Sequence, residues 1–412
     1  MSAASARYLL VLLLLLFVAQ QAAAERVVGM SKRVYDHIAE VQELFDKDEW
    51  TAGMEKLDAL RKIRLSSYEM AHVLNMTGFA WYQLDDLERA MATYSEALAQ
   101  PDLPVSQVRG LLTTVSQLAL MAEDYPAAER YSIRLVELKG EVPTDPAAWV
   151  VLAQARIGQE NYAGALAPLL TAISAEREKG HTPRENWLVL LSSVYYMNDD
   201  FTAMRAVLYE LVALYPKEKY LLNLAALHGQ LGDSQKQLAL VESLLDDQRL
   251  EQGNHLLSLA NLFLAHGLPY KAAALLEREM KSGRIETSRR NLELESQAWY
   301  MAGEETRAIP PLAAAAAIAE DSSLHMRVAR LYMDNYDWTG AESASRTAIK
   351  TSDKDDPGEA LLLLGMALAG ANKLEEAKSA FGKAVLHENT AVLAQQWLGY
   401  IDNEQRRMAA LQ

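Results

Sequence analysis

The sequence contains no cysteine. It therefore has no disulfide framework, no thiolate nucleophile and no Cys-ligated zinc or iron–sulfur cluster. Glycine and proline are sparse, with 20 and 12 among 412 residues, and an all-β sandwich or barrel needs more turn residues than this. Basic residues are in deficit, because 40 Lys and Arg stand against 55 Asp and Glu, for a formal net charge of −15. This balance argues against binding to nucleic acid and against a polybasic contact with anionic lipid.

Long apolar runs are absent beyond the N-terminus, and the run found there has the form of a secretion signal. Arg7 precedes an apolar segment at residues 8–19, and a triple alanine at residues 22–24 provides an Ala-x-Ala cleavage site. The apolar segment is shorter than the roughly 20 residues of a membrane-spanning helix. We therefore predict a signal peptide at residues 1–24, an exported protein and no integral membrane segment after cleavage. An uncleaved anchor is the alternative, whereas a bacterial lipoprotein is excluded because the cleavage site has no cysteine.

After a short lead-in at residues 25–33, one pattern recurs ten times. Each copy contains polar turn residues, and most copies add an aromatic or apolar residue with an alanine two or three positions later. Apolar residues lie three and four positions apart on both sides of each copy, which predicts two amphipathic helices joined by a turn. Successive copies end 33 to 39 residues apart. The residues that end the ten copies are Gly53, Ala90, Ala128, Ala165, Met204, Gln237, Ala272, Ala308, Ala341 and Ala377.

This pattern resembles the tetratricopeptide repeat, a helix–turn–helix unit of about 34 residues. The resemblance implies an all-α, tetratricopeptide-type α-solenoid. It implies a right-handed superhelix of about ten helix–turn–helix repeats over residues 34–390 and a C-terminal capping helix at residues 391–412. Copies that end in Gly53, Met204 or Gln237 depart from the alanine and should pack less closely. The residues that carry the likeness are Gly78, Trp81, Ala90, Tyr94, Ala97, Leu361, Leu362, Leu363, Leu364, Gly365, Ala377, Phe381 and Ala384.

Signs of catalysis or metal binding are weak. No two of the eight histidines are three or four residues apart, so no helical metal pair exists. The loop at residues 353–358 is acidic but lacks the glutamate that closes a calcium loop. The chain has no nucleophile elbow, phosphate-binding loop or dinucleotide fingerprint. We therefore predict a protein that is not an enzyme and has no metal or cofactor. A solenoid enzyme acting on peptidoglycan is the less favoured alternative, because no non-repeat segment longer than about 30 residues could hold a catalytic domain.

A binding surface remains the main functional prediction. In stacked helical pairs the first helix of each pair lines the concave groove, and residues beside its packing stripe should point into that groove. Planar rings and amides suit the recognition of a protein segment. The alternative is that these are ordinary solvated helix positions. The predicted groove residues are Asn75, Phe79, Tyr82, Gln117, Gln154, Tyr195, Asn223, Asn261, Arg290, Gln297, Tyr300 and Arg330.

Four short segments resemble periplasmic tetratricopeptide proteins encoded beside the TonB, ExbB and ExbD energy-transduction components. They lie at residues 28–31, 183–187, 267–273 and 356–360. This resemblance implies a non-enzymatic protein–protein interaction scaffold in TonB-dependent uptake, for instance of iron carriers, with components of the TonB complex as partners. An adaptor in cell-envelope assembly or polysaccharide export is the alternative.

Overall fold

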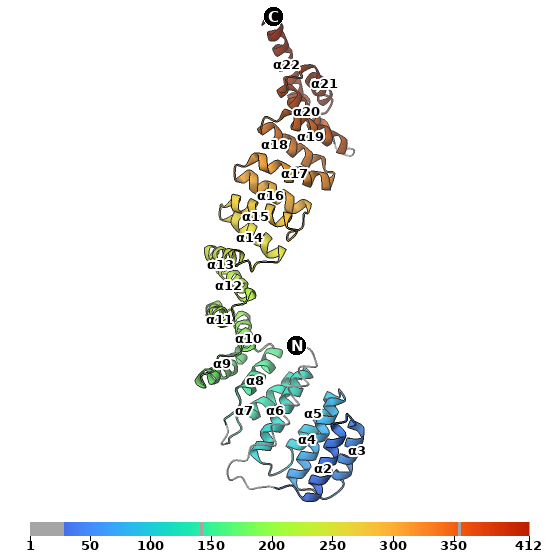
Figure 1. Ribbon diagram of the computed structural model, residues 1–412, viewed down its shortest axis with the longest axis vertical. Helices are drawn as coiled ribbons and strands as arrows, with labels where there is room; N and C mark the ends of the chain where they lie inside the picture. The colour runs from blue at the N-terminus through green and yellow to red at the C-terminus, as the bar shows by residue number, and fades with distance from the viewer. Residues whose placement is uncertain (1–28, 141–142, 353–355, 412) are drawn as a thin grey trace. The chain divides into compact units, whose positions relative to one another are not determined.

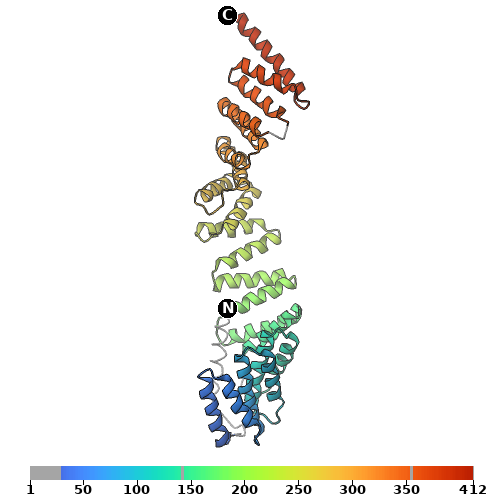
Figure 2. The ribbon, with the colours of Figure 1, turned by 90° about the vertical axis from the view of Figure 1, so that its right-hand side faces the viewer.

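The computed structural model describes residues 29–140, 143–352 and 356–411. Within these ranges the chain forms 21 α-helices and no β-strand (Figure 1, Figure 2). The predicted signal peptide at residues 1–24 lies outside the described residues. In the part of the chain that is described, no helix is both long and apolar enough to span a membrane.

The helices divide between two compact units, one ending at Tyr215 and the other beginning at Pro216. The N-terminal unit contains α2 (Lys32–Phe45), α3 (Trp50–Arg61), α4 (Ser67–Gln83), α5 (Leu87–Leu98), α6 (Val105–Met121), α7 (Tyr125–Val136), α8 (Pro146–Gly158), α9 (Tyr162–Glu178), α10 (Glu185–Met197) and α11 (Phe201–Leu214). The C-terminal unit contains α12 (Glu218–Gln230), α13 (Ser234–Asp246), α14 (Gly253–Ala265), α15 (Pro269–Lys281), α16 (Arg289–Met301), α17 (Glu305–Ala319), α18 (Ser322–Asp334), α19 (Trp338–Thr351), α20 (Gly358–Gly370), α21 (Leu374–Ala384) and α22 (Ala391–Leu411).

Successive helices form ten antiparallel pairs, five in each unit, and α22 packs against α21 at the end of the second unit. Within each unit a helix contacts mainly its neighbours along the chain, as expected of a repeat array in which every unit buries its apolar face against the next. The structure confirms the predicted all-α, tetratricopeptide-type α-solenoid with about ten repeats and a C-terminal capping helix. The handedness of a superhelix through the whole chain stays a prediction.

The turn inside every pair has the same geometry. The left-handed residue lies two positions after the first helix, or three after α2, with φ between 57° and 81°, and the next N–H donates to the carbonyl five residues back. In the second pair, Asp85 is left-handed and Asp86 N donates to Trp81 O over 3.0 Å. This hydrogen-bond pattern closes a helix by satisfying its last carbonyls. The ten left-handed residues are Asp48, Asp85, Glu123, Glu160, Asp199, Gly232, Gly267, Gly303, Tyr336 and Asn372.

The residue that follows the left-handed position starts the second helix. Asp86 Oδ1 accepts a hydrogen bond from Arg89 N over 2.9 Å, and Asp124 accepts one from Ala127 N over 3.0 Å. An acidic or amide side chain at this position satisfies a free N–H of the first helical turn. In six of the ten pairs, the polar residues of the sequence pattern are therefore the end of one helix followed directly by a side-chain cap of the next.

Replacing Gly303 by alanine is expected to lower the free energy of unfolding by about 1 kcal/mol, because a residue with a Cβ is strained in the left-handed region. The backbone alone carries this cost, since a Cβ on Gly303 would meet no atom within 4 Å. The matched control is Gly382→Ala inside α21, where a Cβ also meets nothing and alanine should add about 1 kcal/mol through helix propensity. Urea unfolding followed by circular dichroism measures both changes, and the same sign for the two would contradict the turn assignment.

In two of the pairs, an aromatic ring of the second helix lies on a glycine of the first. Gly365 in α20 faces Phe381 in α21, and a Cβ on Gly365 would lie 2.5 Å from the Phe381 ring. Gly78 in α4 faces Tyr94 in α5 in the same way, at 2.8 Å. Both rings are at most 1% exposed. Glycine is required at these two positions because the backbone of one helix must approach the ring of the other closely.

Candidate binding surface on the first helices

All twelve residues predicted for the groove lie on the first helix of a pair. Those in the N-terminal unit are Asn75, Phe79 and Tyr82 on α4, Gln117 on α6, Gln154 on α8 and Tyr195 on α10. Those in the C-terminal unit are Asn223 on α12, Asn261 on α14, Arg290, Gln297 and Tyr300 on α16, and Arg330 on α18. The sequence-based choice of helix is therefore right for every residue, and exposure decides which of them can meet a ligand.

Six of the twelve occupy one repeat-equivalent position, six residues before the left-handed residue that ends the first helix. The other four pairs have Gln42, Ser193, Ala226 and Met366 there. None of these ten side chains is buried, and the first helices of successive pairs contact one another at α2–α4, α6–α8 and α18–α20. We call this set the surface row. Its members are Gln42, Phe79, Gln117, Gln154 and Ser193 in the N-terminal unit, and Ala226, Asn261, Gln297, Arg330 and Met366 in the C-terminal unit.

Side-chain amides are the most frequent polar groups of the surface row. Gln154, Asn261 and Gln297 are exposed, and Gln117 is half-buried. Asn261 Nδ2 donates to Leu257 O of its own helix over 2.9 Å, which orients the amide. A side-chain amide presents a donor and an acceptor and can therefore bond both faces of a peptide group. The row members that sequence reasoning missed could have been found by counting back from each turn, because position and not residue type defines the row.

One predicted aromatic residue on α4 belongs to the core instead. Tyr82 is 6% exposed and packs with Tyr94 and Leu118. Apolar side chains on α6 cover this part of α4, so the Tyr82 ring gains more from burial than from exposure, and its assignment to the groove was wrong. Phe79 is half-buried, with ring centroids 5.8 Å from Trp50 and 6.5 Å from Phe45, and it keeps its place in the surface row.

At the ends of α10 and α16, the register position of an aromatic residue decides whether its side chain is exposed. Tyr300 is 52% exposed and lies three residues before its left-handed glycine. Tyr196 holds the equivalent position in α10 and is 50% exposed. Tyr195, the predicted residue, lies one position earlier, where Trp299 is buried in α16. Burial raises the pKa of Tyr195, and the charge of Asp200 adds to the effect. Tyr196, and not Tyr195, is therefore the exposed tyrosine equivalent to Tyr300.

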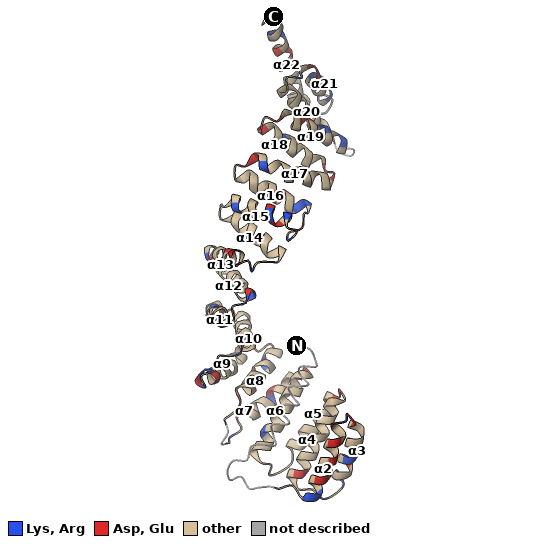
Figure 3. Ribbon diagram, in the orientation of Figure 1, with Lys and Arg blue, Asp and Glu red and all other residues tan. Residues whose placement is uncertain are grey.

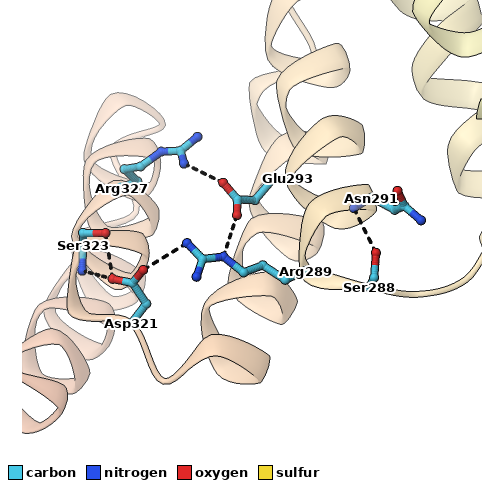
Figure 4. A network of polar contacts seen from close by, with 7 residues as sticks. All are labelled: Ser288, Arg289, Asn291, Glu293, Asp321, Ser323 and Arg327. Atoms are coloured by element: carbon cyan, nitrogen blue, oxygen red, sulfur yellow. Dashed lines mark hydrogen bonds and ion pairs between the residues drawn. The ribbon is translucent and has the colours of Figure 1, made fainter.

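Ion pairs fix part of the surface in the C-terminal unit (Figure 4). Arg289 on α16 bridges Glu293 Oε1 at 2.8 Å and Asp321 Oδ2 at 3.1 Å. Arg327 on α18 donates to Glu293 Oε2 at 3.1 Å. Hydrogen bonds from Ser323 lower the pKa of Asp321, and burial acts in the opposite direction. The pairs hold the start of α18 against α16, so this face is ordered before any partner arrives.

Charges of both signs lie close together elsewhere in the C-terminal unit. Figure 3 shows basic and acidic residues next to one another around α15 and α17. Arg307 Nη2 donates to Glu277 Oε2 over 2.6 Å, and Arg330 of the surface row pairs with Glu359 on α20. Among the described residues, no group of three or more His, Cys, Asp or Glu side chains is placed to hold a metal ion.

The ten helical pairs define the chain as an α-solenoid of the helix–turn–helix repeat class. No protein-family profile matches the sequence, and no curated protein matches it. Among solved structures, a tetratricopeptide repeat protein from Parabacteroides merdae is 15% identical, with a TM-score of 0.38 over 74% of this chain and 100% of that one. MamA from Desulfovibrio magneticus is 15% identical, with a TM-score of 0.36 over 45% and 97%. YrrB, described as having an unusual peptide-binding site, is 14% identical, with a TM-score of 0.35 over 43% and 85%. Scores this low do not identify a family, so the assignment of the solenoid class rests on the ten helical pairs described above.

Proposed function

We propose that the protein is a non-enzymatic scaffold that binds a protein segment along its first helices. The observation that carries this proposal is the surface row, in which amides hold the same register position in three repeats of the N-terminal unit and two of the C-terminal unit. Side-chain amides at a repeated position can bond the backbone of an extended segment. Tyr196 and Tyr300 add exposed rings close to the row, and tyrosine gives contact area at a low entropic cost.

The net charge of the protein indicates the kind of segment that it binds. The formal net charge of −15 favours a segment that carries Lys or Arg. We also propose, from the N-terminal pattern and the short segments described above, that the chain is exported to the periplasm. There it would act as an adaptor of TonB-dependent uptake, with TonB-complex components as partners.

The periplasmic domains of TonB and ExbD are therefore the first ligands to test, by isothermal titration calorimetry with the chain from residue 25 onward. We expect Tyr196→Ala and Tyr300→Ala each to cost about 1–3 kcal/mol of binding free energy, because exposed aromatic anchors commonly carry that much. Gln297→Ala should cost less. The matched control is Tyr209→Ala, which removes a tyrosine that is 47% exposed on a second helix, α11, and should leave the affinity unchanged.

Two outcomes separate the parts of this proposal. If no TonB-complex component binds and a deletion strain takes up TonB-dependent nutrients normally, the partner is wrong while the scaffold role stands. If a bound partner is unaffected by both tyrosine variants, the first-helix surface is the wrong face. The intact mass of the protein from an envelope fraction tests export, since cleavage should leave residue 25 at the N-terminus.

A further inference from the structure

One side of the last helix, α22, packs against α21, and the opposite side is exposed. Ala394 and Ile401 are fully buried. Trp397 stacks on Phe381 of α21 with ring centroids 5.5 Å apart. Lys378 Nζ donates to Asp402 Oδ1 over 2.5 Å. These contacts set the rotation of α22 about its axis, and so they also set which side chains face outward.

The outward face of α22 is uncharged over most of its length. Val392, Gln396, Gly399 and Asn403 are exposed and follow one another at intervals of four, three and four residues, the spacing of a helix-pairing seam. Val392 is 74% exposed, and Tyr400 beside the seam is 52% exposed. Residues 390–401 carry no charge, in a chain where 23% of residues are charged. Gly399 leaves the middle of the seam open, because a Cβ there would meet no atom within 4 Å.

Charges stand only at the two ends of this seam, and their signs are opposite. Glu388 is exposed just before α22, and Arg406 is exposed on the seam side beyond it. A parallel pair of such helices would set like charges against each other. An antiparallel pair would set Glu388 of each helix against Arg406 of the other, with the crossing at the level of Trp397, midway between them. Charge complementarity therefore favours an antiparallel copy of the same helix.

Apolar side chains beside the seam fit the same register. Leu393 lies seven residues before Tyr400, on the same flank of α22, and is 46% exposed. In an antiparallel pair centred at residue 397, Tyr400 of one helix lies level with residue 394 of the other and next to its Leu393. The same two-fold contact forms twice, as in any isologous interface.

We propose that the outward face of α22 is an interface between two copies of this chain, which pair as antiparallel helices with each Tyr400 packed against the other copy's Leu393. The interface is separate from the surface row, so it does not depend on the proposed partner. Dimerisation through α22 would give one assembly two binding surfaces, and two linked sites bind a multivalent partner more tightly than one.

Sedimentation velocity over a range of concentrations tests the proposal on the chain from residue 25 onward. The unaltered protein should show a concentration-dependent dimer. Tyr400→Ala should raise its dissociation constant about tenfold or more, as for a central aromatic anchor. Arg406→Glu should weaken the dimer similarly, and Arg406→Glu combined with Glu388→Arg should restore it. The control Tyr336→Ala removes a tyrosine that is 79% exposed in the α18–α19 turn and should change nothing.

A protein that is monomeric at every concentration would overturn the proposal. A dimer that is equally stable in the Tyr400→Ala and Arg406→Glu variants would also overturn it. If the charge swap fails to restore a dimer that Arg406→Glu has weakened, the antiparallel register is wrong. Circular dichroism of each variant checks that helix content is unchanged, as expected for substitutions at exposed side chains.

Discussion

Replacing Trp299 by alanine is expected to lower the free energy of unfolding by about 3–5 kcal/mol, the usual cost of removing a buried tryptophan. The side chain is 1% exposed. The guanidinium carbon of Arg307 lies 3.4 Å from the centroid of its ring, and the Tyr270 ring meets it edge-on at 5.3 Å. Glu295, one turn earlier in α16, is buried, and burial raises the pKa of its carboxyl group. The substitution therefore removes packing and a cation–π contact beside a buried acid.

Hydrogen exchange shows where this loss acts. Each repeat of a solenoid is stabilised by its neighbours, so amides of α15, α16 and α17 should exchange faster while those of α2 to α5 should not. Tyr300→Ala, one residue later but 52% exposed, is the matched control and should cost less than 1 kcal/mol. Equal losses for the two variants would mean that the register of α16 is wrong.

Glu69→Gln is expected to have the second-largest effect, a loss of about 2–3 kcal/mol at pH 7. Burial by itself would raise the pKa of Glu69, but hydrogen bonds from Ser66 and Ser31 lower it from 4.5 to about 2. Ser31 N and Oγ donate to Glu69 Oε1 over 2.8 and 2.7 Å, and Ser66 N donates to Oε2 over 2.9 Å. The carboxylate therefore joins the residue before α2 to the cap of α4.

The pH dependence follows from the direction of the shift. Because the pKa of Glu69 is lower in the folded state than in the unfolded state, its stabilising contribution is complete above pH 4.5. It is lost as the pH falls towards 2. A shift of this size corresponds to about 3 kcal/mol. Unfolding followed by circular dichroism should therefore show a difference between Glu69→Gln and the unaltered chain that shrinks by more than half between pH 7 and pH 3. A constant difference would contradict the assignment, and Glu88→Gln, at an exposed site on α5, serves as the control.

Local chemistry explains why the helical pairs could be predicted so fully. Each turn is specified by a few adjacent residues, a left-handed residue such as Asp85 followed by a capping residue such as Asp86. Apolar residues at three- and four-residue spacing then define the buried side of each helix. These signals act over fewer than ten residues, so no knowledge of distant contacts is needed. For the same reason, α22 was placed correctly.

Exposure of the candidate residues was less predictable, because it depends on what lies on the neighbouring helix. Tyr82 and Tyr300 hold the same position in their repeats, yet they are 6% and 52% exposed. Tyr82 packs in a cluster with Leu111, Val115 and Leu118 of α6. The expected position beside the packing stripe selected Tyr82 and Tyr195. The structure shows that Tyr82 is buried and Tyr195 half-buried, and that Tyr196 is the exposed ring at the end of α10.

For the capping helix too, the sequence predicted the element, and packing decided which of its side chains are exposed. The amides of Gln395, Gln396 and Asn403 are exposed, as expected of a helix that caps the end of a repeat array. The contacts of Ala394, Trp397 and Ile401 with α21 turn Val392 and Tyr400 outward as well, which the composition of the segment does not reveal. By itself, the sequence determined the repeats, the turns and the identity of the first helices, because short-range hydrogen bonds and periodicity encode them. Only the tertiary structure decided which side chains remain accessible to a partner, because burial is a property of two surfaces and not of one.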